Sequence, residues 1–592
     1  MITTESVMLE VGAVMLIAFV GAAIASKLRQ SVILGYILAG VLIGPNIHLQ
    51  LGSITYNGIV TDTTLIDYFS YLGLILLMFF IGLEFSISKI KKTKSTAAIL
   101  AMVNLGVNMF TGIMLGTALG WPLIDTVFLA GIISMSSSAV AMKSVIELKR
   151  LANPETEFLI GVSITESFLS MLLLTIIGGL MVKDGSGPVD LTALAIGIGV
   201  FYAFFVVLAI WIIPRTVKHL QRIKSDEMFV IFALGIVFLS AALAEISGVP
   251  AIIGAFFIGM VFAETKVSSR FEEKIVPFRD AFVAIFFVSF GMLIDPAMFL
   301  GTWWIVAIAV GIVILNDLFI TAILAYFLGF SARASVTIGS SLCGRDAESV
   351  MFASVGSRAV GATKGAELYP FAGVLCFITS AIAPPLMRRS VPLAEWLSRR
   401  LPEYIKFSSA IISRTLGKIM MPSAFPLHRK TRRMGIALII YFIVLAAVVV
   451  TVGPLHIVAF CAALAFAVVL GKVFPSELQP IVRSTSYTNI GFAPRHPTRI
   501  VGFVSSIIMM SLLMIVIVAF LFIYFWPSVL LVLLAYFLGV ILLMKLNYER
   551  TYDFDRIRGG PPEGSFEVQP RSSFERSNPS EKSASRTRWK WL

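Results

Sequence analysis

The sequence has few charged residues and only three cysteines. Asp, Glu, Lys and Arg make up 14% of the 592 residues, whereas soluble domains are typically about a quarter charged. Cys343, Cys376 and Cys461 each lie within an apolar run without a second cysteine or a histidine at metal-binding spacing. We find no nucleophile–base set and no phosphate-binding loop. These absences argue against a soluble domain, a disulfide framework, a resident metal or cofactor, and an enzyme.

Apolar runs dominate what remains. Hydrophobic residues make up 58% of the chain, the mean hydropathy is +0.92, and runs of about 20 residues recur, the length that crosses a bilayer as a helix. The N-terminal run lacks the basic flank of a cleavable signal and is expected to be a retained first helix. We predict thirteen helices in an all-α polytopic membrane domain over residues 1–387, near 7–26, 31–48, 66–86, 96–119, 123–147, 156–182, 190–213, 226–248, 250–265, 277–298, 302–329, 334–357 and 366–387.

Basic residues alternate between the connections. They concentrate in every second one, at residues 89–94, 143–150, 215–224 and 266–274. The opposite side carries only Lys183, Arg358 and Lys364 of the 47 Lys and Arg. Because cytoplasmic loops of membrane proteins are enriched in Lys and Arg, the N-terminus is predicted outside a cytoplasmic membrane. The net charge of +13 is thus explained by topology, and no nucleic-acid partner is predicted.

The composition changes after residue 387. Residues 388–433 are basic and partly amphipathic, which suits either a helix lying on the anionic membrane surface or a solvated linker. Residues 434–546 contain about four more apolar helices, near 434–453, 455–472, 501–526 and 527–546. The tail from 547 to 592 is basic and polar and is predicted to be a disordered cytoplasmic segment.

One carboxylate lies in the middle of an apolar run. Glu166 falls about halfway along residues 161–177, where a charge costs several kcal/mol or more and usually marks an ion site or a proton relay. Three other runs have polar centres. They contain Ser136, Ser137 and Ser138 in the fifth span, Asn316 and Asp317 in the eleventh, and Gly344, Arg345, Asp346 and Glu348 in the twelfth. A glycine followed by charges is where a membrane helix can break and expose backbone groups to a substrate.

These groups suggest an exchange chemistry if their helices meet. A carboxylate that binds either H⁺ or a monovalent cation, but not both, is sufficient for antiport. The oxygen ligands available to Na⁺ or K⁺ are Glu166, Thr165, Ser163, Asp317 and the hydroxyls of Ser136, Ser137 and Ser138. Arg345 is the expected charge partner, which could replace the cation in the empty state. The alternative is a permanent buried salt bridge between Glu166 and Arg345 that only stabilises the bundle.

Four segments carry a family resemblance. LGYILAGVLIGP (34–45), LGLILLMFFIGLEF (72–85), VPAIIGAFFIGMVFAET (249–265) and FRDAFVAIFFVSFGMLID (278–295) resemble the monovalent cation:proton antiporter family, which includes Kef-type potassium/proton and prokaryotic sodium/proton exchangers. The resemblance covers about residues 7–387. It implies an inverted-repeat fold with two crossing broken helices, here the fifth and twelfth spans. It also implies a scaffold around spans 1–3 and 8–10 that forms a homodimer, and a core that moves like an elevator.

The resemblance also assigns site residues. The ion-binding pair of the family, an Asp preceded by Asn, Gln or Asp, falls on Thr165–Glu166, and its Ser/Thr-rich patch falls on Ser136–Ser138. Many members have a Lys where this chain has Asn316–Asp317, and related branches have an Arg at the place of Arg345. With one carboxylate in the pair and no such Lys, one-for-one electroneutral exchange is favoured.

The predicted function is exchange of Na⁺ or K⁺ for H⁺ across the cytoplasmic membrane, with a role in pH homeostasis. The alternative is a non-transporting sensor or assembly platform built on an antiporter-like bundle. A channel is a weaker alternative, since no repeated filter sequence is present.

Overall fold

The computed structural model describes most of the apolar part of the chain. The described residues are 4–28, 32–47, 49–51, 54–56, 58–60, 63–84, 95–150, 153–181, 207, 213, 215, 217, 225–246, 250–294, 296–345, 347–359, 361–420, 440, 441, 444, 454–484, 497–524 and 526–556. They are helical apart from turns and one hairpin, in which β1 (Leu49–Leu51) pairs antiparallel with β2 (Ile54–Tyr56). Nine described helices, or up to ten with one bent pair, are long and apolar enough to cross a membrane.

The all-α polytopic architecture is therefore confirmed, and the count of thirteen spans stays a prediction. The expected seventh span at 190–213, the apolar run at 434–453 and the tail beyond 556 lie wholly or largely outside the described residues. The chain divides into two compact units. The first comprises Met1–Thr321 and Thr337–Ser390, and the second comprises Ala322–Val336 and Val391–Leu592.

The first unit contains a group of six helices that pack chiefly against one another, termed here the first helix group. Its members are α1 (Thr4–Lys27), α2 (Val32–Ile43), α3 (Thr63–Glu84), α11 (Asp226–Ile246), α12 (Ala251–Ala263) and α13 (Ser268–Met292). Helices α3 and α12 touch through their backbones at glycines. A Cβ atom on Gly259 would collide with the Phe79 carbonyl oxygen, and one on Gly82 would collide with that of Phe256. Small residues thus allow the close contact that membrane helices use in place of hydrophobic collapse.

Helix α13 differs from its prediction. Residues 266–274 were expected as a loop, but the helix already begins at Ser268 and bends by 62° between Ser268–Ile275 and Asp280–Met292. The sequence has Pro277 inside this bend, and proline lacks the N–H that a continuous helix needs. Two basic residues of the expected loop, Arg270 and Lys274, form ion pairs with Asp226 at 3.0 and 2.8 Å. The helix start is therefore anchored to α11.

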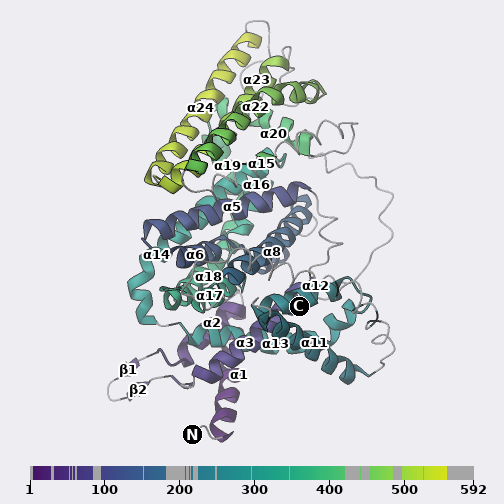
Figure 1. Cartoon of the computed structure of the whole chain (residues 1–592), viewed down its shortest axis with the longest axis vertical. Helices are drawn as coiled ribbons and strands as arrows, with labels where there is room; N and C mark the ends of the chain where they lie inside the picture. The colour runs from purple at the N-terminus through teal and green to yellow at the C-terminus, as the bar shows by residue number, and fades with distance from the viewer. Residues whose placement is uncertain are drawn as a thin grey trace. The chain divides into compact units, whose positions relative to one another are not determined.

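The remaining helices of the first unit form the second helix group. They are α5 (Ser95–Ala118), α6 (Leu123–Ser134), α7 (Ser138–Glu147), α8 (Pro154–Met181), α14 (Pro296–Ile314), the π-helix η2 (Leu315–Thr321), α16 (Ala332–Leu342), of which Thr337 onward belongs here, α17 (Ala347–Ser357) and α18 (Gly365–Arg388). Figure 1 shows α5, α6, α8, α17 and α18 gathered together, in agreement with their packing. The fifth and twelfth predicted spans are both broken, as expected, into α6 and α7 and into α16 and α17.

The second unit has its own apolar core. Its helices are α15 (Ala322–Phe327), α19 (Ser390–Arg400, in this unit from Val391), α20 (Glu403–Met420), α22 (Pro454–Ser484), α23 (Pro497–Tyr524) and α24 (Trp526–Arg556). Helix α20 lies within residues 388–433, for which a surface helix or a solvated linker is predicted, and it buries Phe407 and Ile411 among these helices. Helix α24 continues past the expected tail start at 547, because Tyr548 packs on Phe407 and donates a hydrogen bond to Glu403 at 3.2 Å.

Candidate functional site

The carboxylate of Glu166 lies against the break between α6 and α7. Its residue is 1% exposed on α8, and its Oε1 accepts a hydrogen bond from the backbone N–H of Ser136 at 3.0 Å. Ser136 is in neither helix, so its N–H is free of the helical ladder and can reach a side chain. The second carboxylate oxygen, Oε2, has no hydrogen-bond partner among the described residues. Half of this buried carboxylate is therefore available to a ligand.

The three serines of the break differ in their contacts. Ser137 caps α7, because its Oγ accepts from the Val140 N–H at 3.0 Å. Its own N–H donates to the Gly344 carbonyl at 2.8 Å, which joins the break of α6–α7 to that of α16–α17. Ser136 is 4% exposed, and Ser138 is half-buried. The hydroxyl of Thr165 donates to the Gly161 carbonyl of its own helix at 2.9 Å. Thr165 is next to Glu166 in the chain, but its hydroxyl hydrogen is already used within α8.

Arg345 joins the two broken helices. Its side chain is fully buried, and its five N–H groups face five acceptors. Nε donates to the Ile133 carbonyl, near the end of α6, at 2.6 Å. Nη1 donates to the carbonyls of Leu342 and Gly344 at 2.8 and 3.2 Å. These carbonyls lie at helix C-termini, whose negative dipole ends favour a cation. Nη2 donates to Asn108 Oδ1 and Asp317 Oδ2 at 3.4 and 3.0 Å.

Arg345 thus has a different carboxylate partner from the one expected. The ion pair joins Arg345 to Asp317, with both side chains 0% exposed, rather than to Glu166. Asp317 Oδ1 also accepts from Asn108 Nδ2 at 2.9 Å, so both Asp317 oxygens are occupied. Asp317 lies on the π-helix η2, where it and the adjacent Asn316 are both buried. The residue spacing of a regular α-helix does not predict this π-helical turn.

Two asparagines on α5 belong to the site and were missed from the sequence. Asn108 donates to Asn104 Oδ1 at 3.1 Å and accepts from Asn316 Nδ2 at 3.1 Å. Asn104 Oδ1 also accepts from Thr321 at 2.7 Å. Asn104 and Asn108 are four residues apart, hence on one face of a membrane helix, and that pattern was the available signal. Asp346, named with Arg345 in the sequence, lies outside the described residues.

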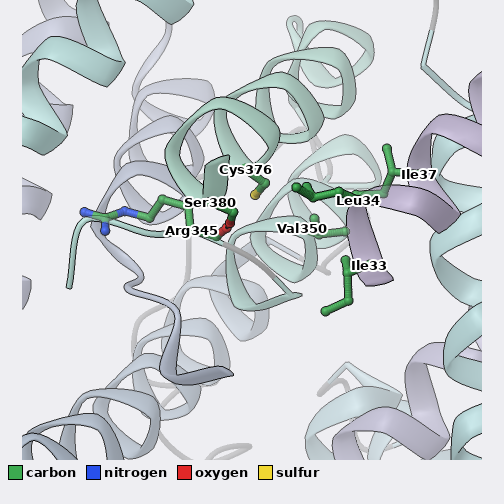
Figure 2. A pocket seen from close by; sticks show the side chains of 7 residues that line it. All are labelled: Ile33, Leu34, Ile37, Arg345, Val350, Cys376 and Ser380. Atoms are coloured by element: carbon green, nitrogen blue, oxygen red, sulfur yellow. The ribbon is translucent and has the colours of Figure 1, made fainter. Parts of the chain in front are cut away.

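A narrow cavity separates this site from α2. It is lined by Ile33, Leu34 and Ile37 of α2 and by Arg345, Val350, Cys376 and Ser380 (Figure 2). The Arg345 side chain points away from the α2 residues in Figure 2, and its Nη2 contacts Asn108 and Asp317. Its backbone is held by α18, since its N–H donates to Thr379 Oγ1 at 3.1 Å and its carbonyl accepts from Ser380 at 2.6 Å. The cavity therefore lies between the two helix groups.

In the described part of the chain, no group of three or more His, Cys, Asp or Glu could hold a metal ion.

Sequence comparisons with known proteins agree on one class of protein. A family model described as "Sodium/hydrogen exchanger, transmembrane" matches residues 14–389. The K(+)/H(+) antiporter subunit KhtU of Bacillus subtilis is 31% identical over 396 residues, which cover 67% of this chain and 96% of KhtU. The Na(+)/H(+)-K(+) antiporter GerN of Bacillus cereus is 26% identical over 364 residues, or 61% of this chain and 90% of GerN. A solved structure of the sodium proton antiporter MjNhaP1 from Methanocaldococcus jannaschii covers 66% of this chain and 99% of its own, with 16% identity and a TM-score of 0.46.

Proposed function

The chain belongs to the sodium/hydrogen exchanger family of transmembrane proteins, and we propose that it exchanges Na⁺ or K⁺ for H⁺ by alternating access, with both ions competing for Glu166. The names of its relatives support both cations. The observation that carries the proposal is the Glu166 carboxylate, which is 1% exposed, faces a helix break and has one oxygen without a partner among the described residues.

The geometry makes the competition direct. A buried carboxylate is most stable when it is either protonated or paired with a cation, because an isolated charge in an apolar interior is costly. Protonation of Oε2 removes the charge that attracts Na⁺ or K⁺, and a bound cation opposes protonation. Unwound backbone at a broken helix supplies carbonyl oxygens that suit such cations. The α6–α7 break, with Ser136, Ser137 and Ser138, is the proposed source of these ligands.

We assign Asp317 and Arg345 a supporting role. Each oxygen of Asp317 accepts a hydrogen bond, from Asn108 or from Arg345, and the ion pair neutralises the guanidinium in this conformation. In this proposal Glu166 is the exchangeable charge of the site. One cation then replaces one proton, and the predicted exchange is electroneutral.

The packing of the first unit supports a two-body movement. The first helix group, which corresponds to the expected spans 1–3 and 8–10, packs chiefly within itself, and so does the second group with Glu166. We propose that the first group is a scaffold that forms a homodimer, and that the second carries the ion across a cytoplasmic membrane. The basic connections place the N-terminus outside and the C-terminus in the cytoplasm in this proposal.

The test is proton flux in proteoliposomes after addition of Na⁺ or K⁺. The unaltered protein is expected to show cation-evoked flux, Glu166→Gln to show none, and Glu155→Gln to behave as the unaltered protein. Glu155 is a matched control, because it lies in the first turn of the same helix, where it accepts a hydrogen bond from Asn153 at 2.9 Å. Flux retained in Glu166→Gln would refute the assigned site. No flux from correctly inserted unaltered protein would favour the sensor alternative instead.

A further inference from the structure

A second oxygen without a partner lies one helical turn beyond Glu166. Ser170 on α8 is 0% exposed, and its Oγ has no hydrogen-bond partner in the described part of the chain. Ser170 is not part of any ligand set considered from the sequence. A buried hydroxyl without a hydrogen bond is destabilising, so native proteins rarely contain one without a reason.

Buried hydroxyls elsewhere in the same bundle avoid this cost locally. Ser144 on α7 donates to the Val140 carbonyl at 2.8 Å, and Thr165 on α8 donates to the Gly161 carbonyl at 2.9 Å. Both use the carbonyl four residues earlier, which a membrane helix offers to every serine and threonine. Ser170 makes no such bond, although Glu166 stands four residues before it. The Ser170 hydroxyl therefore makes no hydrogen bond to its own helix.

Helix geometry places Glu166 and Ser170 on one face of α8. Residues four apart are neighbours on a helix surface, about 5–6 Å between their Cβ atoms. Because side chains lean toward the helix N-terminus, the Ser170 side chain covers the turn that carries Glu166. Each oxygen has lone pairs to offer a ligand, and neither makes a hydrogen bond to the other in this structure. A cation between them would satisfy both.

We propose that Ser170 is a ligand of the transported cation and sets its affinity together with Glu166 Oε2. This inference rests on the proposed function and adds a hydroxyl oxygen to its site. The proton binds the carboxylate alone, whereas the cation uses carboxylate and hydroxyl. Loss of the hydroxyl therefore weakens cation binding selectively.

The expected effect follows from losing one ligand of hydrogen-bond strength. Such a loss, about 1–1.4 kcal/mol, raises the half-saturating cation concentration about five- to tenfold. The maximal exchange rate is expected to stay near that of the unaltered protein. Because H⁺ competes, exchange at a fixed low cation concentration should begin at a higher pH, and added cation should reverse that shift.

Three variants separate the ligand role from packing. Ser170→Ala removes the oxygen, Ser170→Cys keeps nearly the same volume but replaces a hard oxygen by a soft sulfur, and Ser170→Thr keeps the hydroxyl. Ser144→Ala is the matched control, since it removes a buried hydroxyl that is already satisfied. Each is assayed in proteoliposomes for half-saturating Na⁺ and K⁺, maximal rate and pH profile.

The proposal requires higher half-saturating concentrations in Ser170→Ala and Ser170→Cys, with Ser170→Thr and Ser144→Ala near the unaltered protein. Unchanged values in Ser170→Ala and Ser170→Cys would overturn it. Equal increases in all four variants would also overturn it, because a packing defect would then be the cause. Absence of flux in the unaltered protein is a failure of the proposed function and is recognised separately, before any variant is compared.

Discussion

Replacing Asp317 by Asn tests whether this carboxylate holds Arg345 in place. The change keeps the shape of the side chain and removes the negative charge that lies 3.0 Å from Arg345 Nη2. The guanidinium keeps its bonds to the carbonyls of Ile133, Leu342 and Gly344. It remains a positive charge with 0% exposure and no ionised partner at that position.

The size of the effect follows from burial. Removing one member of a buried ion pair typically costs about 3–5 kcal/mol, because the other charge stays desolvated. A loss of that size lowers the melting midpoint by several degrees at least. In the double variant Asp317→Asn/Arg345→Gln no buried charge is left, and the Gln amide can still donate to two of the three carbonyls. We therefore expect the double variant to be more stable than Asp317→Asn alone.

The assay is thermal unfolding of detergent-purified protein, with the two single variants and the double variant completing a mutant cycle. Arg345→Gln alone should also destabilise, since it leaves Asp317 as the buried unpaired charge. Equal stability of Asp317→Asn and the unaltered protein would refute the assigned pairing. So would strictly additive losses in the double variant, because they would mean that the two charges do not interact.

Two further changes test the backbone arrangement. Ser137→Ala removes the N-cap of α7 and should lower the free energy of unfolding by about 0.5–2 kcal/mol. Ser137→Thr can still cap the helix and should lower it less, as measured by thermal unfolding. Equal losses of stability in both variants would count against the cap. Gly259→Ala should impair folding and lower the yield of monodisperse protein, because the added Cβ meets the Phe79 carbonyl. Gly106→Ala is the control, since a Cβ at Gly106 would have no atom within 4 Å. Equal yields of the two variants would contradict the close contact at Gly259.

Much of the architecture was predictable because a bilayer imposes simple rules. Apolar runs of sufficient length must be helical there, so most described helices fall where the hydropathy placed them. The break at Gly344 was predicted from a glycine followed by charges. The break at Ser136–Ser138 came from the family resemblance, and the serines alone were compatible with an unbroken helix.

Several residues of the candidate site could be predicted from the sequence, but the ion pairs and hydrogen bonds between them could not. Glu166 stands out in any reading, since a carboxylate in an apolar run is rare. The partner of Arg345 could not be chosen in advance, because Glu166, Asp317 and Glu348 were all carboxylates at similar depth. Asn104 and Asn108 carry no charge, and their four-residue spacing gained meaning only when Asp317 and Arg345 were found beside them.

The sequence by itself determined a polytopic helical membrane protein with a buried carboxylate at Glu166, because hydropathy and the cost of intramembrane charge act locally along the chain. Only the tertiary structure decided which charges meet. It paired Arg345 with Asp317, set Glu166 against the freed N–H of Ser136, and left Ser170 without a partner among the described residues. Such choices depend on how helices distant in sequence turn toward one another, and on the π-helix at Asp317, neither of which is encoded in the spacing of any single segment.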